Sequence, residues 1–218
     1  MSQQRMSRTP CIKGLYAITP DCADTEDLLR RARLALAGGA RVLQYRNKSA
    51  DAALRLAQAS ALRELTREFV VPFIVNDDVH LAAQVDADGV HLGAMDGSLD
   101  AARDMLGKHK IIVISCYNQL SLARNAIAAG ADYVAFGAFF SSGVKPDAVT
   151  ADVELLRRAR AEFAVPLVAI GGITAQNGAS LVAAGADALA VISALFDAVD
   201  SRAAAQDFSK LFIRNSAP

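Results

Sequence analysis

The sequence predicts an α/β fold, a single-domain (β/α)8 barrel of the TIM type, and three observations support this prediction. Short apolar runs rich in β-branched residues alternate with alanine- and leucine-rich stretches of helical period. The 218 residues, 53% of them hydrophobic, suit one barrel with a large core. Segments 129–132 and 184–187 both read Ala-Gly-Ala-Asp between a predicted helix and a predicted strand, and segment 38–41 is a looser copy. An open, doubly wound sheet is the weaker alternative, and its dinucleotide fingerprint G-x-G-x-x-G is absent.

Eight runs are predicted to be the strands, because each combines β-branched or aromatic residues with turn residues nearby. Most are apolar at consecutive positions, which is typical of parallel strands that helices cover on the outside. In chain order, the predicted strands are residues 14–19, 41–46, 72–76, 89–92, 110–115, 133–137, 166–171 and 188–193.

The stretches between the strands carry the helical period. Asp24, Asp51 and Thr174 precede three of them and are suited to cap helix N-termini. The glycines of the repeated segments follow helices, where glycine supplies a left-handed C-cap, so we assign them no chemistry. The clearest predicted helices are residues 25–37, 52–69, 120–129, 153–163 and 175–184.

Composition limits the classes of function. The 23 basic and 23 acidic residues cancel, so no global field recruits nucleic acid or a membrane surface. Three cysteines without C-x-x-C spacing argue against a disulfide framework and favour a reducing, cytoplasmic location. No run reaches the roughly 18 apolar residues of a membrane helix. The polar N-terminus predicts a flexible tail over residues 1–12, followed by the barrel over residues 13–214.

Polar side chains follow the strand 41–46, at the end of the barrel where active sites form. Gln44, Arg46 and Lys48 alternate along the chain and are expected to share one side. Acidic neighbours are missing from this segment, and unpaired cations are costly in a core, so we expect an anion to arrive from outside. A solvated strand end is the alternative interpretation.

Carboxylates follow the two next strands. Asp77 and Asp96 come after neighbouring strands, so both can reach one hard cation, and Mg²⁺ prefers one or two carboxylates together with water and phosphate oxygens. Asp78 is better explained as the cap of the helix that begins near Val79. His91, on a short buried strand, is better explained as a hydrogen-bonded core histidine than as a ligand or base.

Glycines and a lysine complete the rim. Gly171-Gly172 and Ile192-Ser193 follow the last two strands, the usual phosphate site of these barrels, although a tight turn alone also requires glycine. Lys145 follows the sixth strand and is expected to join Arg46 and Lys48 in a second anion site. Two phosphate sites and one metal indicate displacement of diphosphate, whose growing charge Mg²⁺ and cations would stabilise.

With these residues the chain resembles the thiamine phosphate synthase family over nearly its whole length. Together the motifs are highly specific, although each alone is weak. They are Gln44-x-Arg46-x-Lys48, Asn76-Asp77-Asp78, Gly89-Val90-His91-Leu92-Gly93 with Asp96, Gly130-Ala131-Asp132-Tyr133-Val134 and Ala169-Ile170-Gly171-Gly172-Ile173.

The resemblance implies a (β/α)8 transferase that joins hydroxymethylpyrimidine diphosphate to a thiazole phosphate, or its carboxylated form, and releases diphosphate by a dissociative displacement. It implies Mg²⁺ on Asp77 and Asp96. It also implies the following contacts: diphosphate with Arg46, Lys48, Asn76 and Lys145; the pyrimidine end with Gln44 and Ser115; the thiazole phosphate with Gly172, Ile192 and Ser193. The substrates are small molecules, and exposed helix faces of such barrels often support homodimers.

Two departures from the family pattern keep alternatives open. The loop after the sixth strand commonly reads Pro-Thr-x-Thr-Lys; here Ser142 stands for a threonine and Val144 replaces a hydroxyl, which costs about 1 to 3 kcal/mol of binding. Ala94 replaces the usual glutamine. A non-catalytic binding relative is therefore an alternative. A thiazole tautomerase is another, disfavoured because its histidine position holds Tyr117.

Overall fold

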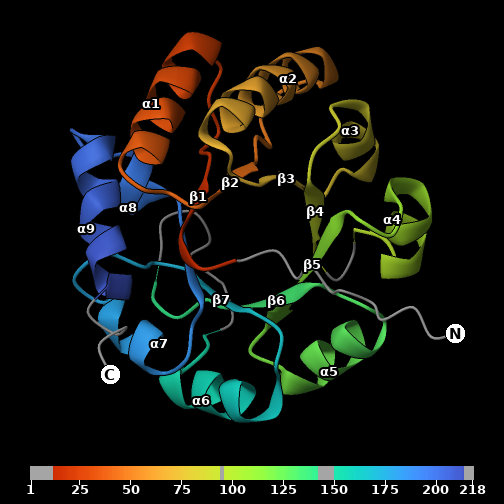
Figure 1. Ribbon diagram of the computed structural model, residues 1–218, viewed down its shortest axis with the longest axis vertical. Coiled ribbons are helices and arrows are strands. Elements are labelled where there is room, and N and C mark those ends of the chain that lie inside the picture. Colours follow the sequence, from red (N-terminus) through yellow and green to blue (C-terminus); the bar gives the residue numbers. More distant parts are fainter. Residues whose placement is uncertain (1–11, 94–95, 142–149, 214–218) are drawn as a thin grey trace, which may run out of the picture.

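The computed structural model describes residues 12–93, 96–141 and 150–213. Its strands form one closed parallel barrel in the order β1 to β8, with β8 hydrogen-bonded to β1 (Figure 1). This confirms the predicted (β/α)8 barrel. The strands are β1 (Gly14–Ile18), β2 (Val42–Tyr45), β3 (Phe73–Asn76), β4 (Gly89–Leu92), β5 (Ile111–Tyr117), β6 (Tyr133–Phe136), β7 (Leu167–Ile170) and β8 (Ala188–Val191).

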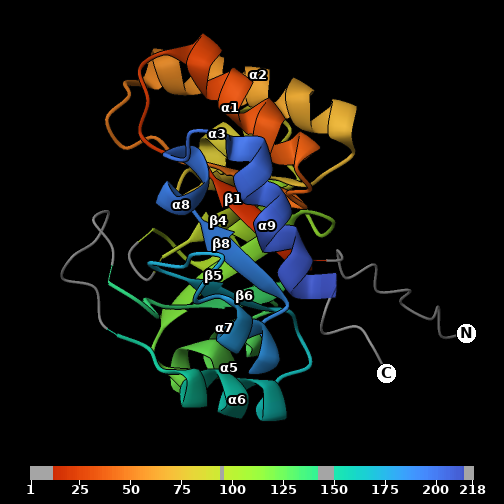
Figure 2. The same cartoon turned by 90° about the vertical axis from the view of Figure 1, so that its left-hand side faces the viewer.

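Helices follow the strands and surround the barrel (Figures 1 and 2). Asp24 and Asp51 cap α1 and α2 as predicted, because their side chains accept hydrogen bonds from the first-turn amides. The described helices are α1 (Thr25–Ala37), α2 (Ala52–Phe69), α3 (Val79–Gln84), α4 (Leu99–Leu106), α5 (Leu120–Ala128), α6 (Val153–Glu162), α7 (Ala179–Ala183), α8 (Ser193–Phe196) and α9 (Ser201–Ile213). Within the described residues, no helix combines the length and the hydropathy needed to cross a membrane.

Three predicted boundaries are wrong by two residues or more. The strand predicted over residues 188–193 ends at Val191, because Ser193 already begins α8. Helix α7 begins at Ala179 rather than at residue 175, because Thr174 and Asn177 bond each other across a turn: the Thr174 amide donates to Asn177 Oδ1 at 2.8 Å. Strand β5 continues two residues beyond its predicted end, to Tyr117. A register shift between Ser115 and Tyr117 accommodates this extension, and Tyr117 has a φ of 51°, in the left-handed region.

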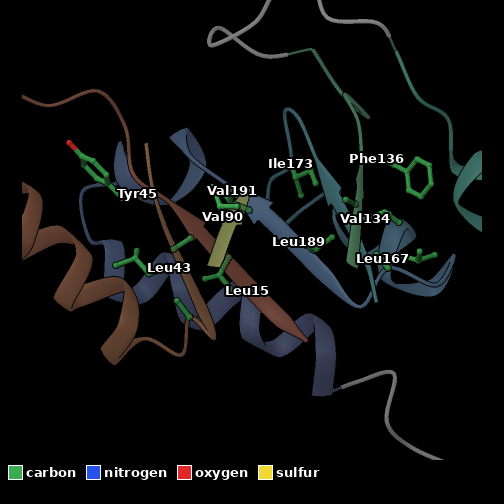
Figure 3. Packing of buried hydrophobic residues seen from close by; sticks show 14 of the residues in the cluster. Leu15, Leu43, Tyr45, Val90, Val134, Phe136, Leu167, Ile173, Leu189 and Val191 are labelled. Carbon is green, nitrogen blue, oxygen red and sulfur yellow. The ribbon is translucent and has the colours of Figure 1, made fainter. Parts of the chain in front are cut away.

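The apolar residues form two layers because strand side chains alternate between the faces of the barrel. The larger layer lies between the barrel and its helices; Leu15, Leu43 and Leu189 belong to it (Figure 3). The second fills the barrel interior, where Tyr16 and Tyr133 contact edge to face, with ring centroids 6.3 Å apart. The interior is therefore a packed core, and a ligand can bind only at its mouth.

Three aspartates connect strands and helices at the N-terminal face of the barrel. Asp132, before β6, accepts hydrogen bonds from the Ile112 amide on β5 and from Arg103 on α4, each at 2.8 Å. Asp88 and Asp187 make the same pair of contacts before β4 and β8. Their partners are the Phe73 amide with Arg63, and the Leu167 amide with Arg160.

We name Asp88, Asp132 and Asp187 the aspartate clamps. Each clamp connects the start of one strand to the strand before it, and to the helix that precedes this earlier strand, through charge-assisted hydrogen bonds. Arg41 occupies the corresponding position before β2: its amide donates to the Leu15 carbonyl of β1, as the Asp132 amide donates to that of Ile112. The Ala-Gly-Ala-Asp repeat thus marks the clamps at Asp132 and Asp187, whereas Asp88 follows Val85-Asp86-Ala87.

Replacing Asp132 by alanine should lower the free energy of unfolding by about 1 to 3 kcal/mol, because the Ile112 amide and the Arg103 guanidinium lose their acceptor. Urea denaturation followed by circular dichroism measures this loss. The matched control is Asp104→Ala on the exposed face of α4, where alanine is the better helix former. Equal stability of the two variants would show that the clamps do not stabilise the barrel.

Candidate active site

A chain of buried hydrogen bonds crosses the barrel interior and ends at its mouth. The Tyr133 hydroxyl donates to that of Tyr16 at 3.1 Å, and the Tyr16 hydroxyl donates to Gln44 Oε1 at 2.8 Å. Gln44 Nε2 then donates to Asn76 Oδ1 at 2.7 Å. Since Oδ1 of Asn76 already accepts from Gln44, its Nδ2 group is the donor left to face the mouth.

Burial keeps both tyrosines of this chain neutral. Tyr16 and Tyr133 are completely buried, and desolvation is the main cause that raises the pKa of each phenol. A neutral phenol retains its proton and remains a donor, so the direction of the chain is fixed from Tyr133 toward Asn76. Gln44 itself is 2% exposed, which makes it part of the core rather than a solvated strand end.

His91 and Ser115 form a second hydrogen-bonded pair, in which His91 is buried and Ser115 is partly buried. His91 Nε2 lies 2.7 Å from Ser115 Oγ, and the imidazole is buried on β4. This agrees with the interpretation of His91 as a hydrogen-bonded core histidine. Ser115, predicted to lie near the pyrimidine and diphosphate, is thereby held in place by a neighbouring strand. His80 and His109 are exposed.

The two cations of the predicted anion site have carboxylate partners, which corrects the expectation that they lack acidic neighbours. Arg46 Nη1 lies 3.2 Å from Asp21 Oδ1, and the same oxygen accepts from the Lys48 amide at 2.7 Å. Lys48 Nζ lies 3.4 Å from Asp77 Oδ2. Asp21 belongs to the loop after β1, and the pairing of β1 with β2 brings it to Arg46. It was missed because the sequence separates them by 25 residues.

Asp77 and Asp96 come together, as the prediction of a shared metal site requires. Burial raises the pKa of the Asp77 carboxyl, and the neighbouring Asp96 carboxyl raises it further, while Lys48 lowers it. Asp77 has a φ of 64°, a left-handed conformation that is unusual for a residue with a side chain. Asp96 Oδ2 also accepts from the Gly93 amide at 2.7 Å.

Asp78 has a different role from Asp77. Its Oδ1 accepts from the Leu81 amide at 2.8 Å, which confirms that it caps α3. The three consecutive residues therefore have different roles: the Asn76 amide is hydrogen-bonded to Gln44, Asp77 places a carboxylate at the mouth, and Asp78 caps α3. One residue in the left-handed region is what separates the directions of the two carboxylates.

The donor set at Asp77 and Asp96 fits a hard divalent cation. Two carboxylates with repelling charges leave excess negative charge that Lys48 offsets only in part. Mg²⁺ typically uses one or two carboxylates and takes its remaining ligands from water and phosphate. Within residues 12–93, 96–141 and 150–213, no cluster of three or more His, Cys, Asp or Glu side chains forms a complete cage. The pair therefore suits an ion that arrives with a phosphate ligand.

A cavity of about 260 Å³ lies beside these groups at the ends of β2 and β3. Four predicted residues line it: Arg46, Lys48, Asn76 and Asp77. Arg55, from the first turn of α2, also lines the cavity and was not predicted. The available signal was a basic residue at a helix N-terminus, where the helix dipole disfavours positive charge.

The predicted thiazole phosphate residues lie on another part of the mouth. Ile170 of β7 is paired with Ala190 of β8. Gly172 and Ile192 each come two residues after these paired positions, so they lie at the ends of neighbouring strands. Ser193 is the first residue of α8. Gly172 has a φ of 62°, and a Cβ there would lie 2.5 Å from the Ser141 carbonyl oxygen. Only glycine fits this turn. Ala94, Ser142, Val144 and Lys145 lie outside the described residues.

The chain is similar to known proteins along almost its whole length. Residues 15–195 match the family model described as thiamine monophosphate synthase. Thiamine-phosphate synthases from Methylobacillus flagellatus and Thiobacillus denitrificans are each 57% identical, over 203 and 199 residues. These alignments cover 93% and 91% of this chain, and 97% and 94% of the relatives. Thiamine phosphate pyrophosphorylase from Pyrococcus furiosus superposes with a TM-score of 0.85 at 35% identity, covering 95% of this chain and 98% of that one. The chain belongs to the thiamine monophosphate synthase family.

Proposed function

We propose that the chain is a thiamine phosphate synthase, a transferase that joins a pyrimidine methyl diphosphate to a thiazole phosphate and releases diphosphate. The observation that carries this proposal is the gathering of Arg46, Lys48, Asn76 and Asp77 around one cavity at the mouth. Membership of the family supports it, because the relatives cover nearly the whole chain. Whether the thiazole carries its extra carboxylate is left open.

The cavity residues bind the leaving diphosphate. Arg46 and Lys48 supply positive charge, Asn76 supplies its Nδ2 donor, and Lys145 adds a further cation from the loop after β6. Charge grows on the diphosphate as its bond to the pyrimidine methylene breaks, so donors fixed in advance stabilise the transition state more than the ground state. The contacts of Arg46 with Asp21 and of Lys48 with Asp77 hold the cations in place before the ligand arrives.

Asp77 and Asp96 would hold Mg²⁺ together with the diphosphate. A divalent ion there would supply positive charge that stabilises the leaving diphosphate. Lys48, paired with Asp77 in the free protein, would add its own charge to the same group. A need to bind a cation would explain why two carboxylates are kept close together in spite of their repulsion.

The rest of the mouth orients the two reacting rings. Gln44 and Ser115 lie near the pyrimidine and diphosphate, while Gly172, Ile192 and Ser193 bind the thiazole phosphate. Ser142 is a further substrate-binding residue. The reaction is dissociative: the carbon–oxygen bond to diphosphate breaks first, and the thiazole nitrogen then forms the new bond to the pyrimidine methylene cation. The substrate supplies the nucleophile, so the protein needs to bind, orient and exclude water. A homodimer and a cytoplasmic location stay predictions.

The direct test is incubation of the full chain with the pyrimidine diphosphate, the thiazole phosphate and Mg²⁺. Thiamine phosphate and diphosphate should appear in equal amounts. Ligand binding without turnover would replace this proposal by a non-catalytic binding protein. Rearrangement of a carboxylated thiazole phosphate without the pyrimidine would indicate a tautomerase instead.

Asp77→Asn and Asp96→Asn should each reduce Mg²⁺-dependent turnover by roughly a hundredfold, because each removes a charged metal ligand. Asparagine tolerates the left-handed backbone at position 77, so Asp77→Asn should not damage the turn. Turnover measured across a Mg²⁺ titration tests this, with Asp100→Asn on the exposed start of α4 as the control. Normal turnover in both variants would remove the metal assignment.

Asp77→Asn should also raise the melting temperature of the metal-free protein at neutral pH. A carboxyl whose pKa is raised on folding binds its proton more tightly in the folded state, so its ionised form costs stability above the raised pKa. The gain should disappear as the pH falls below the unfolded pKa, where the carboxyl is protonated in both states. Calorimetry at several pH values measures it, and a stability loss at neutral pH would contradict the repulsion.

Tyr16→Phe should raise the KM for the pyrimidine diphosphate on the order of tenfold, because Gln44 Oε1 loses its donor and Asn76 is no longer oriented. The KM for the thiazole phosphate should not change. Tyr133→Phe is the graded control: it removes only the far end of the chain and should have a smaller effect. An equal rise of both KM values would indicate general damage to the barrel.

A further inference from the structure

Among the described residues that line the cavity, Arg55 is the cation that has no ion-pair partner. It is the fourth residue of α2 and lines the cavity together with Arg46 and Lys48. The charges of Arg46 and Lys48 are paired, with Asp21 and Asp77 respectively. Arg55 makes no ion pair within 4.0 Å to any residue that the structure describes. Of the cations that line the cavity within the described residues, Arg55 is thus the one without an ion-pair partner.

The Arg55 guanidinium is also incompletely hydrogen-bonded. Its Nε atom is buried and has no acceptor among the described residues. A buried donor without an acceptor costs free energy, so an anion that enters the cavity and accepts from Arg55 would remove this cost. The phenol of Tyr45, whose pKa burial raises to about 12, lies close enough to feel the Arg55 charge, but it donates its proton to Gln58.

Helix stability does not explain the position of Arg55. The first turn of α2 contains no acidic residue, and a cation there opposes the helix dipole. The N-cap Asp51 is occupied by the Leu54 amide at 2.8 Å. Arg55 thus costs α2 stability in two ways, through the dipole and through its buried Nε.

A second hollow, of about 390 Å³, continues outward from the cavity. It shares Arg55, Asp78 and Leu81 with the cavity, and its other side is formed by residues such as Ala53 and His80. These residues belong to α2 and α3, which lie side by side on the outside of the barrel (Figures 1 and 2). Arg55 therefore lies between the inner cavity and the second hollow, some of whose other lining residues, such as Ala53 and His80, are exposed to solvent.

We propose that Arg55 forms an outer anion subsite that receives the departing diphosphate between the inner cavity and solvent. This inference rests on the proposed function, which supplies the ligand. A phosphoanhydride with two phosphate groups can contact Arg46 and Lys48 with one group and Arg55 with the other, since all three residues line the same cavity. No bond forms or breaks at this subsite; Arg55 controls how tightly the product is held.

The test is isothermal titration calorimetry of the full-length protein with inorganic diphosphate and Mg²⁺. Arg55→Gln should bind diphosphate on the order of tenfold more weakly, because the guanidinium charge is lost while a polar side chain remains. Arg55→Lys should restore part of the affinity, since it restores the charge without the planar fork. Product inhibition by diphosphate should weaken in the same order, and affinity for the thiazole phosphate should not change.

Arg67→Gln is the matched control: the same chemical change on the same helix, at an exposed arginine paired with Glu64. It should bind diphosphate as the wild type does. Wild-type diphosphate affinity in Arg55→Gln, or equal loss of diphosphate and thiazole phosphate binding, would overturn the subsite and leave the proposed function standing. Failure of the wild-type chain to form thiamine phosphate would instead overturn the proposed function.

Discussion

The aspartate clamps at the N-terminal face are the interactions on which the geometry of the barrel depends. Each clamp joins three elements: the strand that follows the aspartate, the strand before it in the chain, and the helix that precedes this earlier strand. Because the clamps bind backbone amides at the starts of β3, β5 and β7, they anchor these three strands at the N-terminal face. The rim at that face is where the functional side chains lie, so the position of the site is set at the far end of the same strands.

Between the two ends of the barrel, the packing of the interior determines how the Asn76 side chain is oriented at the mouth. Tyr16 and Tyr133 are large enough to fill the interior, and their hydroxyls need acceptors because they are completely buried. Among the described residues, the hydrogen bonds that meet this need lead through Gln44 to Asn76. A requirement of the core, that no buried polar group be left unpaired, thus determines which atom of Asn76 faces the substrate.

Several residues around the mouth of the barrel lower the stability of the folded protein. Asp77 is in a left-handed conformation and next to another carboxylate, and Arg55 has a buried donor without an acceptor. Strain and unbalanced charge of this kind persist when the surrounding structure holds the residues in place. Two repelling carboxylates lie at one point, and an arginine without an ion-pair partner lies at another. This arrangement is complementary in charge to a metal ion bound to a polyanion. Selection for binding explains this pattern better than selection for folding.

The sequence by itself determined the eight strands, the caps Asp24, Asp51 and Asp78, and the residues that follow each strand, because these depend on short-range period and local hydrogen bonds. It also indicated which strand ends carry charge. The tertiary structure alone decided the partners: Asp21 for Arg46, Tyr16 for Gln44 and Tyr133 for Tyr16, across separations of 25, 28 and 117 residues. It likewise decided where α7 begins and that Arg55 reaches the cavity. The first two pairings form when β1 pairs with β2, and the third forms when the barrel brings β6 opposite β1, so no local pattern in the sequence contains these distances.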